Sequence, residues 1–162
     1  MMSAVPDGLR IRAYERRDDD DVWRLHREGV LETTPQYIDE VAAYEEDLRT
    51  IDETYLSGGA FWVVDDEGGT PIGMAAVQRI DDATARLRRM RVTAAWRGRG
   101  VGQALVDAAV DFCVERAYTK LILDTTEQQR DGQRLYERNG FVKTGERTLG
   151  SFRVFDYERR IG

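Results

Sequence analysis

The sequence predicts one α/β domain over residues 1–162, with a mixed, mostly antiparallel central sheet flanked by helices. The length of 162 residues suits a single domain. The apolar periodicity changes from helical to strand-like at about residue 60. Three strand-like runs then follow one another, joined by turns rich in Asp and Gly that are typical of hairpins.

The first third of the chain predicts one strand and two helices. Residues 8–14 alternate apolar and polar side chains, as a strand does. The acidic run 18–21 precedes apolar residues at helical spacing, and acids at a helix N-terminus interact favourably with its dipole. A second helix is expected over residues 37–56, where apolar residues recur on one side.

The rest of the chain predicts three strands, a helix, a strand, a second helix and two final strands. In order, these elements are 60–64, 72–80, 85–92, 100–117, 120–125, 129–139, 141–149 and 151–160. Asn139-Gly140 is a common signal for the end of a helix. The resulting order, β-α-α-β-β-β-α-β-α-β-β, predicts a mixed sheet with helices on its faces.

Composition narrows the classes of function. A net charge of −6 argues against nucleic acid as a partner, and no apolar run approaches the roughly 18 residues of a membrane span. The N-terminus lacks the apolar block of a signal peptide, so we expect a cytoplasmic protein without a membrane partner. The lone Cys113 is expected to be a core thiol, and the lone His26 a surface or internally hydrogen-bonded helix residue. Neither residue predicts a metal site.

A glycine-rich turn between a strand and a helix is the clearest candidate for a ligand site. Without Cβ atoms the backbone can approach a ligand closely, and the N–H groups of the first helical turn attract anions. The pattern fits neither a Walker loop nor a dinucleotide fingerprint, so it predicts a phosphate or pyrophosphate site, with a purely structural turn as the alternative. The residues are Arg97, Gly98, Arg99, Gly100, Val101 and Gly102.

A second motif, LYERNGF, follows over residues 135–141. The order R-x-x-G-x-G, a short strand and then LYExxGF resembles the GNAT superfamily of acyl-CoA-dependent N-acetyltransferases, over roughly residues 60–160. Shorter segments such as LRRMRV resemble its camello-like branch, which includes N-acetylaspartate synthase.

The resemblance implies acetyl-CoA as co-substrate and a role for each matching residue. The glycine-rich turn would bind the pyrophosphate of CoA, and the main chain of Met90 and Val92 would pair with the pantetheine arm. A backbone N–H near Met90 would stabilise negative charge on the reacting carbonyl oxygen. Tyr136 would protonate the departing thiolate, or else be an ordinary core aromatic. Gln129 stands where many members have an Asn that contacts the cofactor.

One departure concerns the acceptor. Many members carry a Glu, acting as the general base or relaying to it, at a place where this sequence has Arg86, followed by Arg88. Strand alternation puts these two on one side, opposite Arg89 and Arg91. A guanidinium at this place binds carboxylates, so we expect a small amine bearing a carboxylate, unless the arginines are merely solvated or paired within the protein.

The general base is left open between two carboxylates, Glu32 and Asp124, and a chain of water molecules. The expected reaction is direct transfer of an acetyl group to a primary amine of a small molecule, in one ternary complex. A non-catalytic acyl-CoA-binding or regulatory module and a protein N-acetyltransferase are the alternatives. The sequence allows a monomer or a homodimer.

Overall fold

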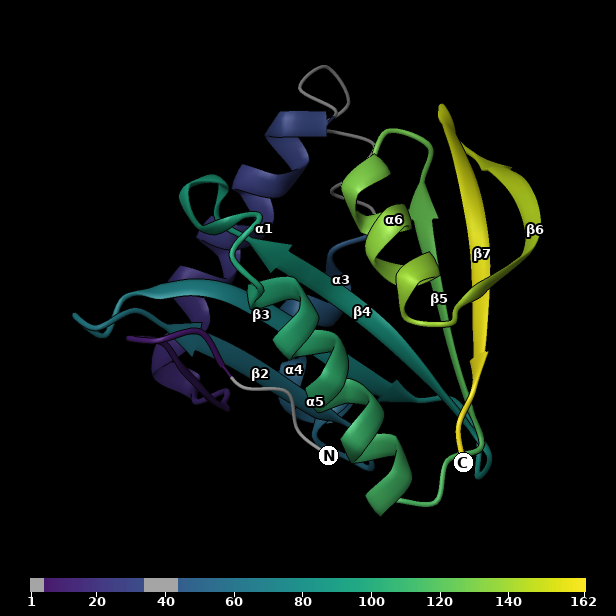
Figure 1. The fold of residues 1–162 in the computed structure, drawn as a ribbon, viewed down its shortest axis with the longest axis horizontal. Coiled ribbons are helices and arrows are strands. Elements are labelled where there is room, and N and C mark those ends of the chain that lie inside the picture. The colour runs from purple at the N-terminus through teal and green to yellow at the C-terminus, as the bar shows by residue number, and fades with distance from the viewer. Residues whose placement is uncertain (1–4, 34–43) are drawn as a thin grey trace.

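A seven-stranded sheet forms the centre of the protein, with strand order β1-β2-β3-β4-β5-β7-β6 (Figure 1). The computed structural model describes residues 5–33 and 44–162. Within this part of the chain, β4 and β5 are the one parallel pair, and the other neighbours are antiparallel. The strands are β1 (Arg10–Ala13), β2 (Ala60–Asp65), β3 (Pro71–Arg79), β4 (Thr84–Val92), β5 (Lys120–Thr126), β6 (Val142–Leu149) and β7 (Phe152–Arg160). The predicted fold class is confirmed.

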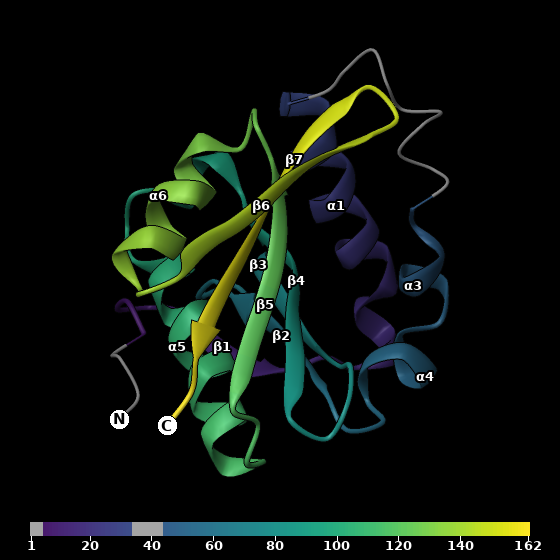
Figure 2. The same cartoon turned by 90° about the vertical axis from the view of Figure 1, so that its right-hand side faces the viewer.

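Helices cover both faces of the sheet, as Figure 2 shows. On one side lie α5 and α6, and on the other lie α1, α3 and α4. The helices are α1 (Asp19–Thr33), α3 (Glu46–Arg49), α4 (Ile51–Tyr55), α5 (Val101–Glu115) and α6 (Arg130–Arg138), with 3₁₀ turns at η1 (Arg16–Asp18) and η2 (Ala94–Trp96).

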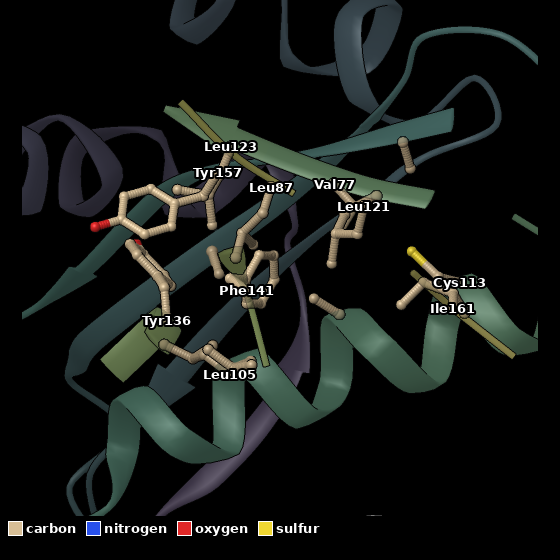
Figure 3. Close-up of a cluster of buried hydrophobic side chains, with 14 of the residues drawn as sticks. Val77, Leu87, Leu105, Cys113, Leu121, Leu123, Tyr136, Phe141, Tyr157 and Ile161 are labelled. Carbon is tan, nitrogen blue, oxygen red and sulfur yellow. The ribbon is translucent and has the colours of Figure 1, made fainter. Parts of the chain in front are cut away.

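Each face of the sheet buries its own apolar cluster, because successive strand residues point to opposite faces. In β2, Phe61 and Val63 pack on the α1 side, whereas Val64 packs on the α5 side. The larger cluster lies beneath α5 and includes Phe141 and Cys113 (Figure 3). Burial raises the pKa of the Cys113 thiol to about 11. The prediction of a core thiol is confirmed.

The predicted helix over residues 37–56 is not continuous where the structure describes it. Residues 37–43 lie outside the described part of the chain, and the remainder forms the two short helices α3 and α4. Thr50 separates them with φ −131° and ψ 44°, which is not a helical conformation. The apolar spacing typical of a helix therefore continues across a residue at which the helix is interrupted.

The two strands at the parallel junction part soon after they meet. The register pairs residues 84–86 of β4 with residues 120–122 of β5, and beyond these the strands diverge (Figure 1). A β-bulge lies in the diverging part of β4, between the pairs Ala76–Arg88 and Met74–Arg91 of the β3–β4 ladder. At the bulge Arg89 has a φ of 56°, which is unusual for a residue other than glycine.

The bulge overturns the prediction that two arginines of β4 face away from the other two. Arg88 lies opposite Ala76 and Arg91 opposite Met74, and both partners belong to the cluster on the α1 side. The extra residue shifts the alternation by one position, so Arg91 lies on the same face as Arg88. The prediction was wrong because it assumed an unbroken period of two.

Candidate active site

The diverging ends of β4 and β5 form one wall of a cleft of about 740 Å³. The N-terminal turn of α5, the helix α6, the last turns of α1 and residues at the β6–β7 turn also line it. Nearly all residues that the sequence singled out line this cleft. They are Glu32, Arg86, Arg88, Met90, Val92, Arg97, Gly98, Gly100, Gly102, Asp124, Gln129 and Tyr136.

The glycine-rich turn leads into α5 through left-handed backbone conformations. Gly98 has a φ of 73° and Gly100, the N-cap residue, a φ of 89°. A Cβ at Gly98 would meet nothing within 4 Å, so the conformation rather than lack of room favours glycine there. At Gly102 the reason is different, because a Cβ would lie 3.0 Å from Cδ2 of Leu135 in α6.

The N-terminus of α5 leaves backbone N–H groups available to a ligand. The first hydrogen bond of the helix runs from the N–H of Ala104 to the carbonyl of Gly100, at 3.1 Å. Its N-cap residue is Gly100, which has no side chain to cap the helix, so the N–H groups of residues 101–103 precede its hydrogen-bonded ladder. Such groups, together with the helix dipole, bind phosphate.

The two arginines of the turn have partners within the protein. The Nε of Arg97 donates to the carbonyl of Val92 at 3.0 Å, and its Nη2 lies 2.5 Å from a carboxylate oxygen of Glu32. The guanidinium of Arg99 lies 4.9 Å from the ring centre of Trp96. Arg97 thus occupies the carbonyl of Val92, one of the main-chain groups expected to meet the pantetheine arm.

Met90 lies within the bulge and has no partner in the described β3–β4 register. The side chains of Met90 and Val92 pack against the cluster beneath α5, on the face opposite Arg91. The β4–β5 register ends at Arg86, so the main chain that follows borders the cleft rather than β5. An extended ligand could lie there as an added strand.

Tyr136 belongs to the core and also reaches the cleft. Its ring packs edge-on against Phe141 at 5.8 Å, and it lies with Tyr157 at one end of the buried cluster (Figure 3). Burial raises the pKa of its phenol to about 12, so the hydroxyl keeps its proton at neutral pH. No hydrogen bond joins this hydroxyl to another residue of the described chain. The core and catalytic interpretations are therefore compatible.

Gln129 immediately precedes α6, and its side chain accepts hydrogen bonds from the loop before the helix. Its Oε1 accepts hydrogen bonds from Oγ1 of Thr125 at 2.8 Å and from the N–H of Thr126 at 3.1 Å. The carbonyl end of the side chain is thus used within the loop, and its amide nitrogen is the end that can contact a ligand.

Two candidate residues of the acceptor side form an ion pair with each other. Nη2 of Arg86 donates to Oδ2 of Asp124 at 2.6 Å, and Arg147 contacts the same oxygen at 2.5 Å. The sequence suggested Arg86 as the residue that binds the carboxylate of the acceptor, but Arg86 is already paired with a carboxylate of the protein. Arg88 donates to Oε1 of Gln78 at 3.3 Å and lies 3.6 Å from Asp47.

His26, which the sequence did not single out for function, is buried at the edge of the cleft. Its Nε2 lies 2.8 Å from Oε1 of Glu45, and its Nδ1 lies 3.5 Å from Nη1 of Arg89. Burial and the positive charge of Arg89 lower its pKa to about 4, so the imidazole is neutral at neutral pH. Nε2–H then donates to Glu45, and Nδ1 faces the guanidinium as an acceptor. The internally bonded alternative is the one that the structure shows.

A comparison of the sequence with models of protein families identifies the family of this chain. A model of the acetyltransferase (GNAT) family matches residues 20–141. The chain belongs to this family. The family expected from the two motifs is confirmed.

Curated relatives support the expected branch. N-acetylaspartate synthetase of Danio rerio is 35% identical over 112 residues, covering 68% of this chain and 39% of that protein. Human N-acetyltransferase 8B is 33% identical over 118 residues, covering 68% of this chain and 51% of that protein. The chain thus spans about half or less of the length of these relatives.

Solved structures share the fold. A GNAT-family acetyltransferase from Staphylococcus aureus Mu50 superposes with a TM-score of 0.82 at 22% identity, covering 95% of this chain and 99% of that one. YncA of Salmonella typhimurium, solved with its cofactor acetyl-CoA, gives a TM-score of 0.73 at 18% identity, covering 96% and 95%. Among the described residues, no helix is long and apolar enough to cross a membrane. In the same ranges, no three His, Cys, Asp or Glu side chains are grouped to hold a metal ion.

Proposed function

We propose that the protein transfers an acetyl group from acetyl-CoA directly to the primary amine of a small molecule that also carries a carboxylate. The observation that carries the proposal is the cleft between β4 and β5. An uncapped helix N-terminus, an unpaired stretch of strand and a protonated phenol all border it.

The described residues fit acetyl-CoA. The N–H groups at the start of α5 and the turn from Arg97 to Gly102 suit the pyrophosphate. The free edge of β4 beyond Arg86 suits an extended pantetheine arm, which would pair with Met90. Acetyl-CoA supplies the acetyl group as a thioester.

The chain supplies positioning and proton transfer. The backbone at the Met90 bulge offers an N–H to the thioester oxygen as negative charge develops on it. The amine nitrogen forms its bond to the carbonyl carbon, and the carbon–sulfur bond breaks. Tyr136 gives its proton to the sulfur, as its raised pKa allows. No covalent intermediate with the protein is required.

The proton of the attacking amine has a less obvious route. Glu32 is paired with Arg97, and Asp124 with Arg86 and Arg147. These ion pairs favour release of the amine proton to water in the open cleft over direct transfer to either carboxylate.

The carboxylate on the acceptor is argued from charge. The face of β4 toward α1 presents guanidinium groups rather than carboxylates to the cleft, which disfavours a polycation such as a polyamine. The relative named N-acetylaspartate synthetase acts, by its name, on an amine of this kind. A non-catalytic acyl-CoA-binding or regulatory module and a protein N-acetyltransferase stay as alternatives.

The test is the release of CoA thiol from acetyl-CoA in the presence of matched amines. The panel contains amino acids, amino-acid conjugates, spermidine and a lysine-containing peptide. Acetylation of the anionic amino acids supports the proposal. Acetylation of spermidine or the peptide alone would contradict the acceptor class, and tight acetyl-CoA binding without transfer to any amine would favour the non-catalytic module.

A further inference from the structure

Arg91 differs from the other three arginines of β4. Arg86 pairs with Asp124, whereas Arg88 and Arg89 share Asp47, which lies 2.5 Å from Nη2 of Arg89. Arg91 forms no ion pair with a carboxylate of the described chain. Among residues 5–33 and 44–162, its buried Nε has no hydrogen-bond partner, and its Nη1 reaches the carbonyl of Met90 at 3.5 Å.

Arg91 is partly buried, with its Nε shielded from solvent, and it lines the cleft that the proposed reaction uses. A charge held away from water without a counter-ion is unfavourable. Burial, with a smaller contribution from the positive Arg89, lowers the pKa of Arg91 to about 10, so the side chain is still a cation at neutral pH. Within the described chain this positive charge is therefore not paired with a carboxylate, and it lies where a ligand can reach it.

The opposite wall makes room for this side chain. A Cβ at Gly29, inside α1, would lie 2.6 Å from Cδ and 2.7 Å from Nε of Arg91. Glycine in a helix interior costs roughly 0.5–1 kcal/mol relative to alanine. Glycine at position 29 thus lowers the stability of the helix slightly, but it allows the side chain of Arg91 to pack against the helix.

The position suits an acceptor molecule. Arg91 and Tyr136 line the same cleft, and Arg91 is close enough to Glu32 for that carboxylate to raise its pKa. Its side chain lies on the α1 face of β4, whereas Met90 and Val92 pack toward α5. A group bound by Arg91 would therefore approach the reacting carbonyl from the face opposite the core beneath α5.

We propose that Arg91 is the residue that binds the carboxylate of the acceptor, through the donors of its charged guanidinium, and that Gly29 provides the space it requires. This inference rests on the proposed function and assigns the anchoring role to Arg91 rather than to Arg86. The bound carboxylate supplies the missing counter-ion and hydrogen bonds. It also holds the amine, a few bonds away, beside Tyr136.

The experiment compares α-amino acids with their carboxamides, which keep the amine and lose the negative charge. The wild type and the variants Arg91→Met, Arg91→Lys and Gly29→Ala are assayed for kcat/KM with each member of a pair. Arg134→Met is the matched control, since it removes an exposed cleft arginine that pairs with Asp131. Melting temperatures verify that each variant is folded.

We expect Arg91→Met to lower kcat/KM for the acids by roughly 30-fold or more, the effect typical of a lost partner in a buried charge pair. The carboxamides should change by less than about threefold, within the range of a substitution that removes no contact to them. Arg91→Lys should lie in between, because lysine keeps the charge but lacks the bidentate geometry. Gly29→Ala should reproduce the loss by displacing the guanidinium, and Arg134→Met should leave the acid preference unchanged.

Stability gives a readout that a structural role would not produce. Because Arg91→Met removes an unpaired buried charge, it should keep or raise the melting temperature while it lowers activity toward acids. A wild type without preference for acids over carboxamides, or an equal loss for both in Arg91→Met, would overturn the assignment.

A binding measurement keeps this inference separate from the proposed function. Calorimetry measures the binding of an α-amino acid from the assay to the complex of the enzyme with CoA. No transfer can occur there because CoA carries no acetyl group. Binding that is present in the wild type and lost in Arg91→Met supports the anchor, even if no amine is acetylated and the proposed function fails. Undetectable binding to the wild type, or unchanged binding to Arg91→Met, refutes the anchor.

Discussion

Removing one oxygen atom from Tyr136 separates its packing in the core from the general-acid role that we propose for it. In Tyr136→Phe the ring keeps its packing against Phe141, and the hydroxyl makes no hydrogen bond within the described chain whose loss would cost stability. A typical hydrogen bond contributes about 0.5–1.5 kcal/mol, so we expect the free energy of unfolding to change by less than this. Turnover should fall by about 10²-fold or more, which is the usual contribution of a general acid.

A drop of this size corresponds to about 2.7 kcal/mol in the activation free energy. The assay is thiol release at saturating acetyl-CoA and amine, with CoA affinity measured separately by calorimetry and expected to stay nearly constant. Tyr157→Phe is the matched control. Tyr157 lies beside Tyr136 in the same cluster, with ring centres 6.4 Å apart, but does not line the cleft (Figure 3). If Tyr136→Phe turns over within about twofold of wild type, where chemistry limits the rate, the general-acid role of Tyr136 is refuted.

Three other expectations follow from the cleft. Gly100→Val should raise the KM for acetyl-CoA at least about tenfold with the fold preserved, since valine disfavours the φ of 89°; unchanged CoA binding in a folded variant would contradict the cofactor site. The pH dependence of kcat/KM should follow the ionisation of each acceptor's own amine, because the carboxylates of the cleft are paired; a constant inflection across amines of different pKa would point to a base on the enzyme. Stability should fall by up to roughly 3 kcal/mol between pH 6.5 and 4, because unfolded His26 gains a proton that folded His26, with a pKa of about 4, does not. His26→Gln should flatten that profile in urea titrations.

The features that the sequence predicted well are local. The glycine-rich turn, the hairpins of β2 to β4 and the end of α6 at Asn139 each depend on a few neighbouring residues with strong conformational preferences. The burial of Cys113 follows from its place on an apolar helix face. In each case one segment of the chain carries the whole signal.

The features that it missed depend on distant contacts. The position of β7 between β5 and β6 depends on which strands pair, and the spacing of apolar residues along the sequence does not determine this. The sequence has no glycine at Arg89 that would predict the bulge there. The side chain of Arg89 is held by Asp47 from α3. The place of Arg91 in the site depends on that bulge and on Gly29, which is more than 60 positions away. The sequence therefore suggested an arginine anchor at Arg86, whereas the anchor that we propose is Arg91.

The short parallel junction has a mechanical consequence. Strands β1–β4 and β5–β7 form two half-sheets whose strand register, in the described part of the chain, pairs only residues 84–86 with residues 120–122. A ligand that pairs with β4 inside the cleft would act as a strut between these halves. Bound CoA should therefore slow amide hydrogen exchange most in the diverging ends of the two strands, and it should make the halves unfold more nearly as one unit.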